Sequence, residues 1–227
     1  MSGRLSVDEI QSRIAAISDQ DEATSNIDAT DYSLRLKYIN KGQHEWAEIQ
    51  DWQTLFKEYN MNVSTSTGNA SVALPNDFRK LAGYPKITFD GTNTESFSEV
   101  LPQEDHYDAN EKRVWILGNP NSGYILRVFG GTLASGASVK VPYFSSPGSL
   151  ASPADISVVP NAEYLVQKTL SLIWESREDP RFPQAKAEAE KILQNMMERE
   201  NTFNRASDYF RAKTWEEQKF GFRWGKD

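Results

Sequence analysis

The spacing of apolar residues changes twice along this chain, and that change constrains the fold more than any other feature of the sequence. Apolar side chains recur every three to four residues up to about residue 60, alternate in short runs from there to about residue 144, and return to helical spacing after residue 160. A helix buries one stripe and a strand buries one face, so the two spacings need different packing partners. The sequence therefore predicts an α+β protein whose helical part is interrupted by a β-module.

The boundaries of these parts follow from the same spacing. We expect an antiparallel helical bundle made of residues 1–60 and 157–205, with a small antiparallel β-sandwich or barrel at residues 61–156 inserted between its second and third helices. Residues 206–227 follow as an extended C-terminal arm.

Two helices are predicted in the first helical part. Ser6 and Glu9 have the spacing of a capping box, which predicts a short helix to about Ser18. After a polar stretch from Asp19 to Ala29, Thr30-Asp31 marks a second helix start. The apolar stripe of this helix runs through Leu34, Tyr38, Gly42, Trp46, Ile49, Trp52, Phe56 and Tyr59. Because glycine costs a helix about 1 kcal/mol relative to alanine, Gly42 predicts close approach by another helix.

Five to seven short strands are predicted between residues 61 and 144. Residues 61–67 and 70–74 flank Gly68-Asn69, which favours a hairpin. Turn residues such as Asp90-Gly91 separate the other predicted strands, which are 86–90, 94–101, 113–117, 124–129 and 138–144. Short strands at this density are typical of a small sandwich or barrel.

The second helical part is predicted as a pair of helices after a linker at residues 145–153. Pro160-Asn161 opens the first, which is apolar on more than half of its circumference and is therefore expected at the centre of a bundle. Asp179-Pro180 ends it, and Pro183 starts the second helix, which we expect to end at about Arg205. The short loop between them predicts an antiparallel hairpin.

The last 22 residues, Ala206 to Asp227, carry six aromatic side chains among nine charged ones. Ordering a chain end costs roughly 1–2 kcal/mol per residue in backbone entropy, so these rings need a surface to bury against. Aromatic and Arg side chains are also typical anchors of protein interfaces. The segment is predicted to dock onto a partner; the alternative is a strap folded over its own domain. The docking residues are Tyr209, Phe210, Arg211, Lys213, Trp215, Phe220, Phe222, Arg223 and Trp224.

Charge and composition exclude several classes of protein. The net charge is −7, with +1 on residues 206–227 and −8 on the rest, which argues against a general nucleic-acid binder. The chain has no cysteine, so disulfides and thiolate ligands are excluded. It has no run of 18 apolar residues and no apolar signal region near Met1, so we expect neither a membrane protein nor a secreted one.

Signatures of catalysis are nearly absent, and we expect no catalytic residue, metal or cofactor. The two histidines are His44, inside a predicted helix, and His106, in the acidic segment Glu104–Asp108 with Glu111 nearby. That segment lacks the glycine turn and closing Glu of an EF-hand and is interpreted as a solvated turn. Carboxylate pairs suited to glycoside hydrolysis are not singled out by any pattern. Trp46, Trp52 and Trp174 lie on apolar helix faces and are expected in the core, while Trp115 stays unassigned.

Three stretches, taken in order, resemble a known family. Residues 38–46, with the sequence Tyr-Ile-Asn-Lys-Gly-Gln-His-Glu-Trp, resemble the long-helix signature of tailed-phage head–tail adaptor proteins. Residues 74–81 are similar to the Leu-Pro-x-Asp-Phe element that follows the first hairpin in that family. The third stretch is the predicted helical hairpin of residues 164–201. The resemblance covers roughly residues 30–205.

The resemblance implies a structural virion protein located in the neck, between capsid portal and tail, and made in the host cytoplasm. Such adaptors form rings, usually of twelve subunits, with the C-terminal segment reaching into the portal protein and the β-module facing a tail or nozzle protein. DNA passes through the lumen without sequence-specific binding. The alternative is a carbohydrate- or peptidoglycan-active virion enzyme built on the β-module.

Overall fold

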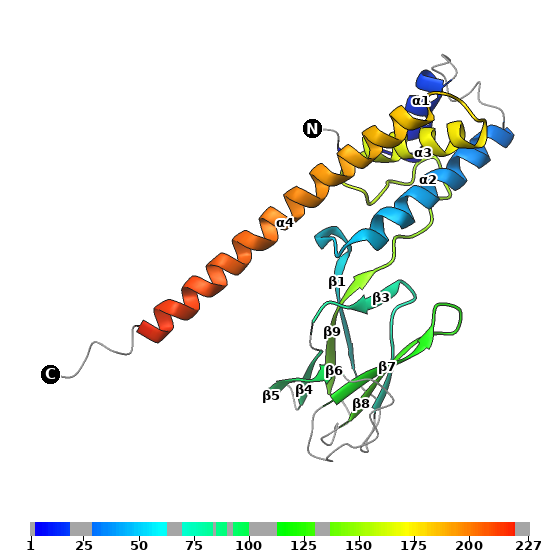
Figure 1. The fold of residues 1–227 in the computed structure, drawn as a ribbon. Coiled ribbons are helices and arrows are strands. Elements are labelled where there is room, and N and C mark those ends of the chain that lie inside the picture. The colour runs from blue at the N-terminus through cyan, green and yellow to red at the C-terminus, as the bar shows by residue number, and fades with distance from the viewer. Residues whose placement is uncertain are drawn as a thin grey trace. The chain divides into compact units, whose positions relative to one another are not determined.

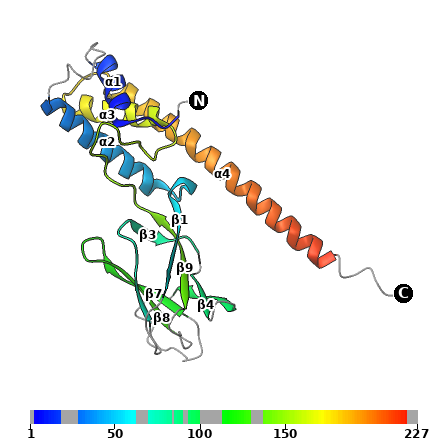
Figure 2. The ribbon, with the colours of Figure 1, turned by 180° about the vertical axis from the view of Figure 1, so that it is seen from behind.

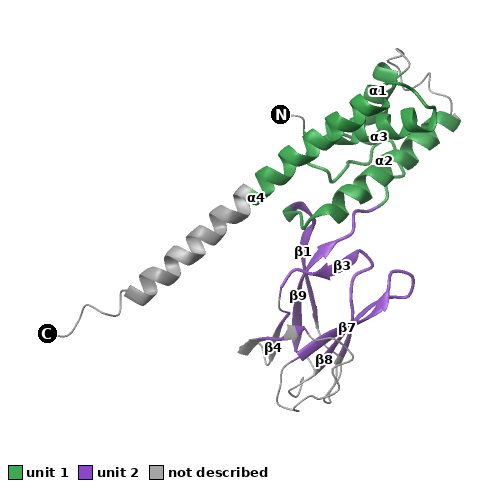
Figure 3. Cartoon of the chain, viewed as in Figure 1, with its two compact units in different colours: residues 1–53, 149–227 green, residues 54–148 purple. Residues whose placement is uncertain are grey.

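The computed structural model describes residues 3–18, 29–62, 70–83, 85–89, 93–99, 113–129 and 137–220, with the side chains of the last helix described as far as Asn201. The chain divides into two compact units, shown in Figure 3. Unit 1 comprises residues 1–53 and 149–227 and holds the α-helices; unit 2 comprises residues 54–148 and holds the β-strands. The predicted α+β class is confirmed.

Unit 1 begins with α1 (Val7–Ser18), whose N-terminus carries the predicted capping box. Ser6 N donates to Glu9 Oε2 at 2.8 Å, and Glu9 N donates to Ser6 Oγ at 3.3 Å. Ser6 also forms an isolated antiparallel bridge with Ile156. The start of the chain is therefore held against the segment that precedes α3.

The second helix, α2 (Ala29–Ile49), ends earlier than its apolar stripe predicts. Beyond it the indole of Trp52 donates to the Trp46 carbonyl at 2.8 Å, and the two rings stack with their centroids 4.6 Å apart. This bond satisfies a carbonyl near the helix end, and a short 3₁₀ helix, η2 (Gln53–Leu55), follows. The prediction that Phe56 and Tyr59 continue the helix was wrong, because they belong to a strand that pairs with a distant one.

The centre of unit 1 is α3 (Ala162–Ser176), which starts where the sequence predicts. Asn161 caps it by accepting a hydrogen bond from Glu163 N at 3.2 Å. The helices α1, α2 and α4 all pack against α3, as both views in Figures 1 and 2 show. Its buried residues accordingly lie on several sides, among them Leu165, Val166, Leu170, Leu172, Ile173 and Trp174.

The turn after α3 confirms the predicted break at Asp179-Pro180. The Asp179 carboxylate accepts hydrogen bonds from Arg181 Nη2 at 2.7 Å and from Arg181 N at 2.9 Å. The side-chain bond first, and then the backbone bond, lower the pKa of Asp179 to about 2. The Arg181 guanidinium also lies 4.5 Å from the centre of the Trp174 ring. These contacts fix the reversal from α3 into α4.

The last helix, α4 (Phe182–Phe220), continues past its predicted end at Arg205. The backbone of residues 206–220 is therefore helical, whereas the aromatic spacing favoured an extended arm. No glycine or proline occurs between Pro183 and Gly221, and many of the intervening residues are good helix formers. Gly221 follows the last helical residue, at a position where glycine commonly ends helices.

Unit 2 contains two sheets, the first of which is antiparallel throughout. Its order is β1-β9-β4-β5, and β3 pairs with the end of β9. The strands β1 and β9 pair along their whole shared length, with Phe56 opposite Phe144 and Asn62 opposite Ser138. The bounds are β1 (Phe56–Asn62), β3 (Phe78–Leu81), β4 (Lys86–Phe89), β5 (Asn93–Ser96) and β9 (Ser138–Ser145).

The second sheet has the order β2-β8-β7-β6. Its strands β7 and β8 form a hairpin, in whose turn Asn119 Oδ1 accepts hydrogen bonds from Asn121 N and Ser122 N at 2.9 and 3.0 Å. The pairing of β6 with β7 is parallel, unlike the other pairings of the described strands. The bounds are β2 (Ala70–Ala73), β6 (Ser98–Glu99), β7 (Arg113–Asn119) and β8 (Gly123–Phe129).

One hydrophobic core joins the two sheets of unit 2. It takes alternate residues of β9, namely Val139, Val141 and Tyr143, together with Val114 of β7 and Leu126 of β8. Two open sheets that share a core make a sandwich, and no barrel closes among the described strands.

Two strand predictions in unit 2 were wrong in detail, and one strand was missed. Residues 61–74 form no hairpin, because β1 pairs with β9 and β2 with β8; residues 63–69 lie outside the described ones. The strand β3, within the 74–81 element, was not predicted. The predicted strand 94–101 is divided at the buried Phe97 into β5 and β6.

Candidate interaction surfaces

The α2 residues that resemble the adaptor signature hold the segment between β9 and α3 in place. Asn40 Nδ2 donates to the Leu150 carbonyl at 2.9 Å, and Leu150 N donates to Asn40 Oδ1 at 2.8 Å. The fully buried Gln43 accepts hydrogen bonds through Oε1 from Ser157 Oγ at 2.9 Å and Val158 N at 3.2 Å. Both side chains are therefore used inside unit 1, where they fix the course of this segment along α2.

Gly42, between these two residues, marks the predicted close approach of another helix. A Cβ atom at this position would lie 3.2 Å from Lys168 Cγ and 3.5 Å from Leu165 Cδ2, both on α3. Lys168 then reaches back to α2, where its Nζ lies 2.7 Å from Glu45 Oε2. The close contact of α2 with α3 thus depends on the absence of a side chain at Gly42 and on the adjacent ion pair between Lys168 and Glu45.

The Leu-Pro-x-Asp-Phe element is likewise used inside unit 2. Phe78 is buried and packs against Tyr143, with ring centroids 5.8 Å apart. Asp77 accepts hydrogen bonds from Tyr143 OH at 3.1 Å and from Lys57 Nζ at 2.6 Å. Burial, followed by the bond to Asp77, raises the pKa of Tyr143 to about 12. This element joins β3, β9 and β1.

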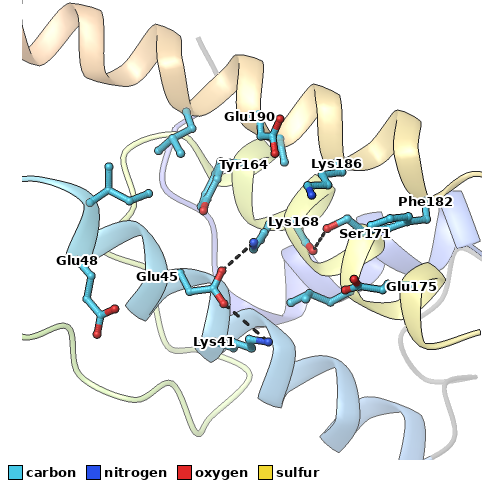
Figure 4. A pocket seen from close by; sticks show the side chains of 14 residues that line it. Lys41, Glu45, Glu48, Tyr164, Lys168, Ser171, Glu175, Phe182, Lys186 and Glu190 are labelled. Carbon is cyan, nitrogen blue, oxygen red and sulfur yellow. Dashed lines mark hydrogen bonds and ion pairs between the residues drawn. The ribbon is translucent and has the colours of Figure 1, made fainter.

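A pocket of about 580 Å³ lies in unit 1 between α2, α3 and α4, as Figure 4 shows. Within it Glu45 lies between two lysines, 3.8 Å from Lys41 Nζ and 2.7 Å from Lys168 Nζ. Burial, followed by the charge of Glu45, raises the pKa of the neighbouring Tyr164 to about 12. The phenol therefore stays neutral in the pH range in which proteins function.

The rest of the pocket lining combines apolar side chains with three carboxylates, one exposed lysine, Lys186, and Ser171, so its formal charge is negative. Ile49 of α2 is an exposed apolar residue, with 42% of its surface accessible. The exposed side chains of Glu48, Glu175 and Glu190 come one each from α2, α3 and α4, and none makes an ion pair with another described residue. Leu172, Leu193, Phe182 and Ala189 add further apolar surface. Such a site suits an apolar ligand that also carries positive charge.

The sequence contains no pattern that singles out these three carboxylates. They come from three helices, and no spacing in the sequence connects them. The one signal was Gly42, which predicted that α2 meets another helix and so indicated where a surface formed by several helices would lie.

The structure locates the predicted docking residues only in part. Tyr209, Phe210, Arg211, Lys213, Trp215 and Phe220 lie on the backbone of α4, and their side chains lie outside the described ones. Phe222, Arg223 and Trp224 follow α4 and lie outside the described residues altogether. Docking by this segment stays a prediction.

The histidines, acidic residues and tryptophans considered for catalysis or metal binding lie in several separate places. His44 is half-buried on α2, while His106, Glu111 and the acidic segment 104–108 lie outside the described residues. The residues that the structure does describe contain no group of three side chains able to hold a metal ion. As predicted, Trp46, Trp52 and Trp174 are buried; Trp115 is half-buried on β7, opposite Arg127 of β8.

Comparison with known protein families gives a match. The model of a family described as SU10 adaptor protein matches residues 5–213. No curated protein matches the chain. Separately, none of the described helices is both long enough and apolar enough to span a membrane.

Proposed function

Because the chain belongs to the SU10 adaptor protein family, we propose that it is a structural protein of a phage virion that joins the head to the tail. The observation that supports this role is the extent of the match, which runs through residues 5–213 and so includes both units. The three stretches that resemble head–tail adaptors all lie within the matched range. In two of these stretches Asn40, Gln43 and Asp77 form hydrogen bonds inside the fold. Such bonds are expected of residues that stabilise a structural protein.

In the finer form of this proposal the protein forms a ring of twelve copies beneath the portal vertex, in the neck of the virion. Duplex DNA passes through its lumen without sequence-specific binding. The charge of the chain supports this, because residues 1–205 carry a net charge of −8, as counted from the sequence. DNA presents one phosphate charge per about 1.7 Å of axis, so an acidic or neutral lumen would let it move without being held.

The C-terminal arm is proposed as the anchor that connects the adaptor to the portal protein or to a neighbouring subunit. Helical geometry supports this, since α4 has 39 residues and α3, against which it packs, has 15. At 1.5 Å per residue these lengths are about 58 Å and 22 Å, so α3 can cover less than half of α4. Four of the aromatic residues predicted to dock belong to the C-terminal half of α4, which α3 is too short to cover, and Phe222 and Trp224 follow α4 in the sequence. A tail or nozzle protein is proposed as the partner of the β-unit.

Assembly with the portal tests the proposal. Full-length protein is mixed with the portal protein of the same phage, sedimented, and imaged by electron microscopy. We expect the two proteins to sediment together and class averages to show an additional ring on the portal. A chain that neither binds the portal nor forms rings at any concentration would refute the adaptor role.

A glycan-hydrolysis assay tests the alternative of a virion enzyme. The adaptor proposal predicts no turnover of peptidoglycan or soluble glycans. Turnover that is lost in Glu104→Ala or Asp108→Ala would instead favour the enzyme.

A further inference from the structure

The pocket between α2, α3 and α4 has a chemistry that the adaptor role does not by itself explain. We propose that it receives the C-terminal segment of a second copy of this chain, with Phe222 and Trp224 inside and Arg223 at the acidic rim. This inference rests on the proposed function, because a contact repeated from copy to copy is what a ring requires.

The pocket fits aromatic rings followed by positive charge. Its volume of about 580 Å³ lies inside the roughly 300–1,000 Å³ range of pockets that enclose small ligands. Ile49 offers exposed apolar surface at the α2 side, and the half-buried Leu193 lines the pocket from α4. The rim carboxylates Glu48, Glu175 and Glu190 make no ion pair among the described residues. They are therefore available to a cationic partner.

The last ten residues of the chain have the complementary composition. Residues 218–227 read Gln-Lys-Phe-Gly-Phe-Arg-Trp-Gly-Lys-Asp and carry three basic residues against one acidic residue. In an extended backbone alternate side chains point to the same side, so Phe222 and Trp224 can enter a pocket together while Arg223 faces its rim. Trp and Arg are among the side chains that contribute most to binding at protein interfaces.

The C-terminal segment cannot reach the pocket of its own molecule. Leu193 is the pocket residue closest in sequence to the end of α4, and the helix continues for 27 residues from there to Phe220. At 1.5 Å per residue, this places Phe220 about 40 Å away along the helix axis. The seven residues after Phe220 span at most about 25 Å when fully extended. The pocket that the segment fills must therefore belong to another copy.

A contact of this kind has a direction. The segment and the pocket are different surfaces, so each copy offers its arm to one neighbour and its pocket to another. Such head-to-tail contacts generate a closed ring when the rotation between copies permits it. The proposed contact thus supplies a repeated connection for the ring.

A peptide-binding experiment tests the pocket directly. The probe is a fluorescent peptide of residues 218–227. Its binding partner is a full-length variant whose own arm is disabled, Phe222→Ser/Arg223→Glu/Trp224→Ser. We expect saturable binding, weakened at least tenfold by the added pocket changes Glu48→Lys, Glu175→Lys and Glu190→Lys. The matched control carries Glu178→Lys, Glu188→Lys and Glu198→Lys. These exposed residues lie in the turn after α3 and on α4, outside the pocket lining, so the control should leave binding unchanged.

A charge exchange separates specific binding from general attraction to a basic peptide. A peptide with Arg223→Glu and Lys226→Glu should bind poorly to the native pocket and should recover affinity for the pocket with three lysines. Equal binding of the original peptide to the pocket variant and the control variant would overturn the proposal. All variants are first compared by circular dichroism and thermal unfolding. The side chains changed in the pocket variant and in the control variant are exposed.

A mixing experiment tests whether the contact joins two copies. The arm variant retains a pocket and the pocket variant retains an arm, so each alone should remain monomeric, while an equimolar mixture should give a 1:1 dimer by analytical ultracentrifugation. A mixture that stays monomeric at concentrations where the peptide binds would contradict the proposal. If these tests fail while the native protein still joins the portal, the inference falls and the adaptor role stands.

Discussion

Asn40 and Leu150 are joined by two hydrogen bonds, in which the side-chain amide of a helical residue pairs with both backbone groups of an extended one. The amide donates through Nδ2 and accepts through Oδ1, so no smaller or purely acidic side chain can satisfy both groups. This explains why an Asn occupies the centre of the α2 stretch that resembles the adaptor signature: it holds the segment that returns the chain to α3.

Replacing Asn40 by Ala should destabilise unit 1. The change leaves the backbone N–H and the carbonyl of Leu150 without their hydrogen-bond partners. An unsatisfied buried group typically costs about 1–3 kcal/mol. Urea unfolding should show a lower midpoint with an unchanged slope. The exposed Lys37, also on α2, provides a control, because Lys37→Ala should change stability by less than about 0.5 kcal/mol.

Gly42 predicts a dependence of stability on side-chain size. Gly42→Ala should be nearly neutral, because a gain in helix propensity of about 1 kcal/mol is offset by a Cβ placed 3.2 Å from Lys168 Cγ. Gly42→Leu should destabilise by about 1–3 kcal/mol, since the larger side chain must separate α2 from α3. Thermal unfolding of both variants measures the difference. Equal melting temperatures would mean that the two helices do not meet closely there.

Tyr143 predicts a loss of stability at high pH. Its pKa in the folded protein is raised to about 12, first by burial and then by the hydrogen bond to Asp77, so the phenol stays neutral while an unfolded Tyr ionises near pH 10. The contribution is therefore fully present below pH 10 and is lost as the pH rises towards 12. Ultraviolet difference titration against Tyr143→Phe should show one phenol ionising late. Asp77→Asn should lower this pKa while leaving it above 10, because burial remains.

Removing residues 206–227 tests whether the arm is an anchor or part of a core. We expect the shortened chain to remain folded and to lose binding to the portal. Its circular dichroism spectrum should show the helical signal expected after the removal of residues 206–220. Co-sedimentation with portal protein measures the second outcome. The anchor role would be excluded by a shortened chain that unfolds, or by one that binds as well as the full-length protein.

The lumen of the assembled ring is expected to be acidic or neutral. This follows from the net charge of −7 on the chain and from the need to pass DNA without gripping it. A map of the assembled ring at side-chain resolution provides the measurement. A lumen lined mainly by Lys and Arg would contradict the prediction.

Local signals in the sequence predicted several helix starts and one helix end well. Ser6 with Glu9, Asn161 and Asp179 each act within three residues of their own position, so their bonds could be anticipated from spacing alone. Gly42 predicted a contact but not its partner. The three-helix pocket could not be anticipated, because its carboxylates come together only once α2, α3 and α4 have packed.

The errors arose where distant pairing decides the structure. Phe56 and Tyr59 continue a helical stripe in the sequence, yet β1 forms because β9 offers it a partner more than seventy residues away. The same long-range pairing separates β1 from β2, which the turn-like Gly68-Asn69 had suggested to be a hairpin. The helical course of residues 206–220 was missed because aromatic spacing was given more weight than the absence of helix breakers.

The pairing of β1 with β9 has a consequence for how this protein can change over evolutionary time. Phe56 lies opposite Phe144, so the chain enters and leaves unit 2 at the same end of one antiparallel pair. The whole unit is thus encoded by one continuous gene segment whose two junctions lie next to each other in space. Recombination can exchange that segment for another β-unit with paired terminal strands while the connections among the four helices stay as they are.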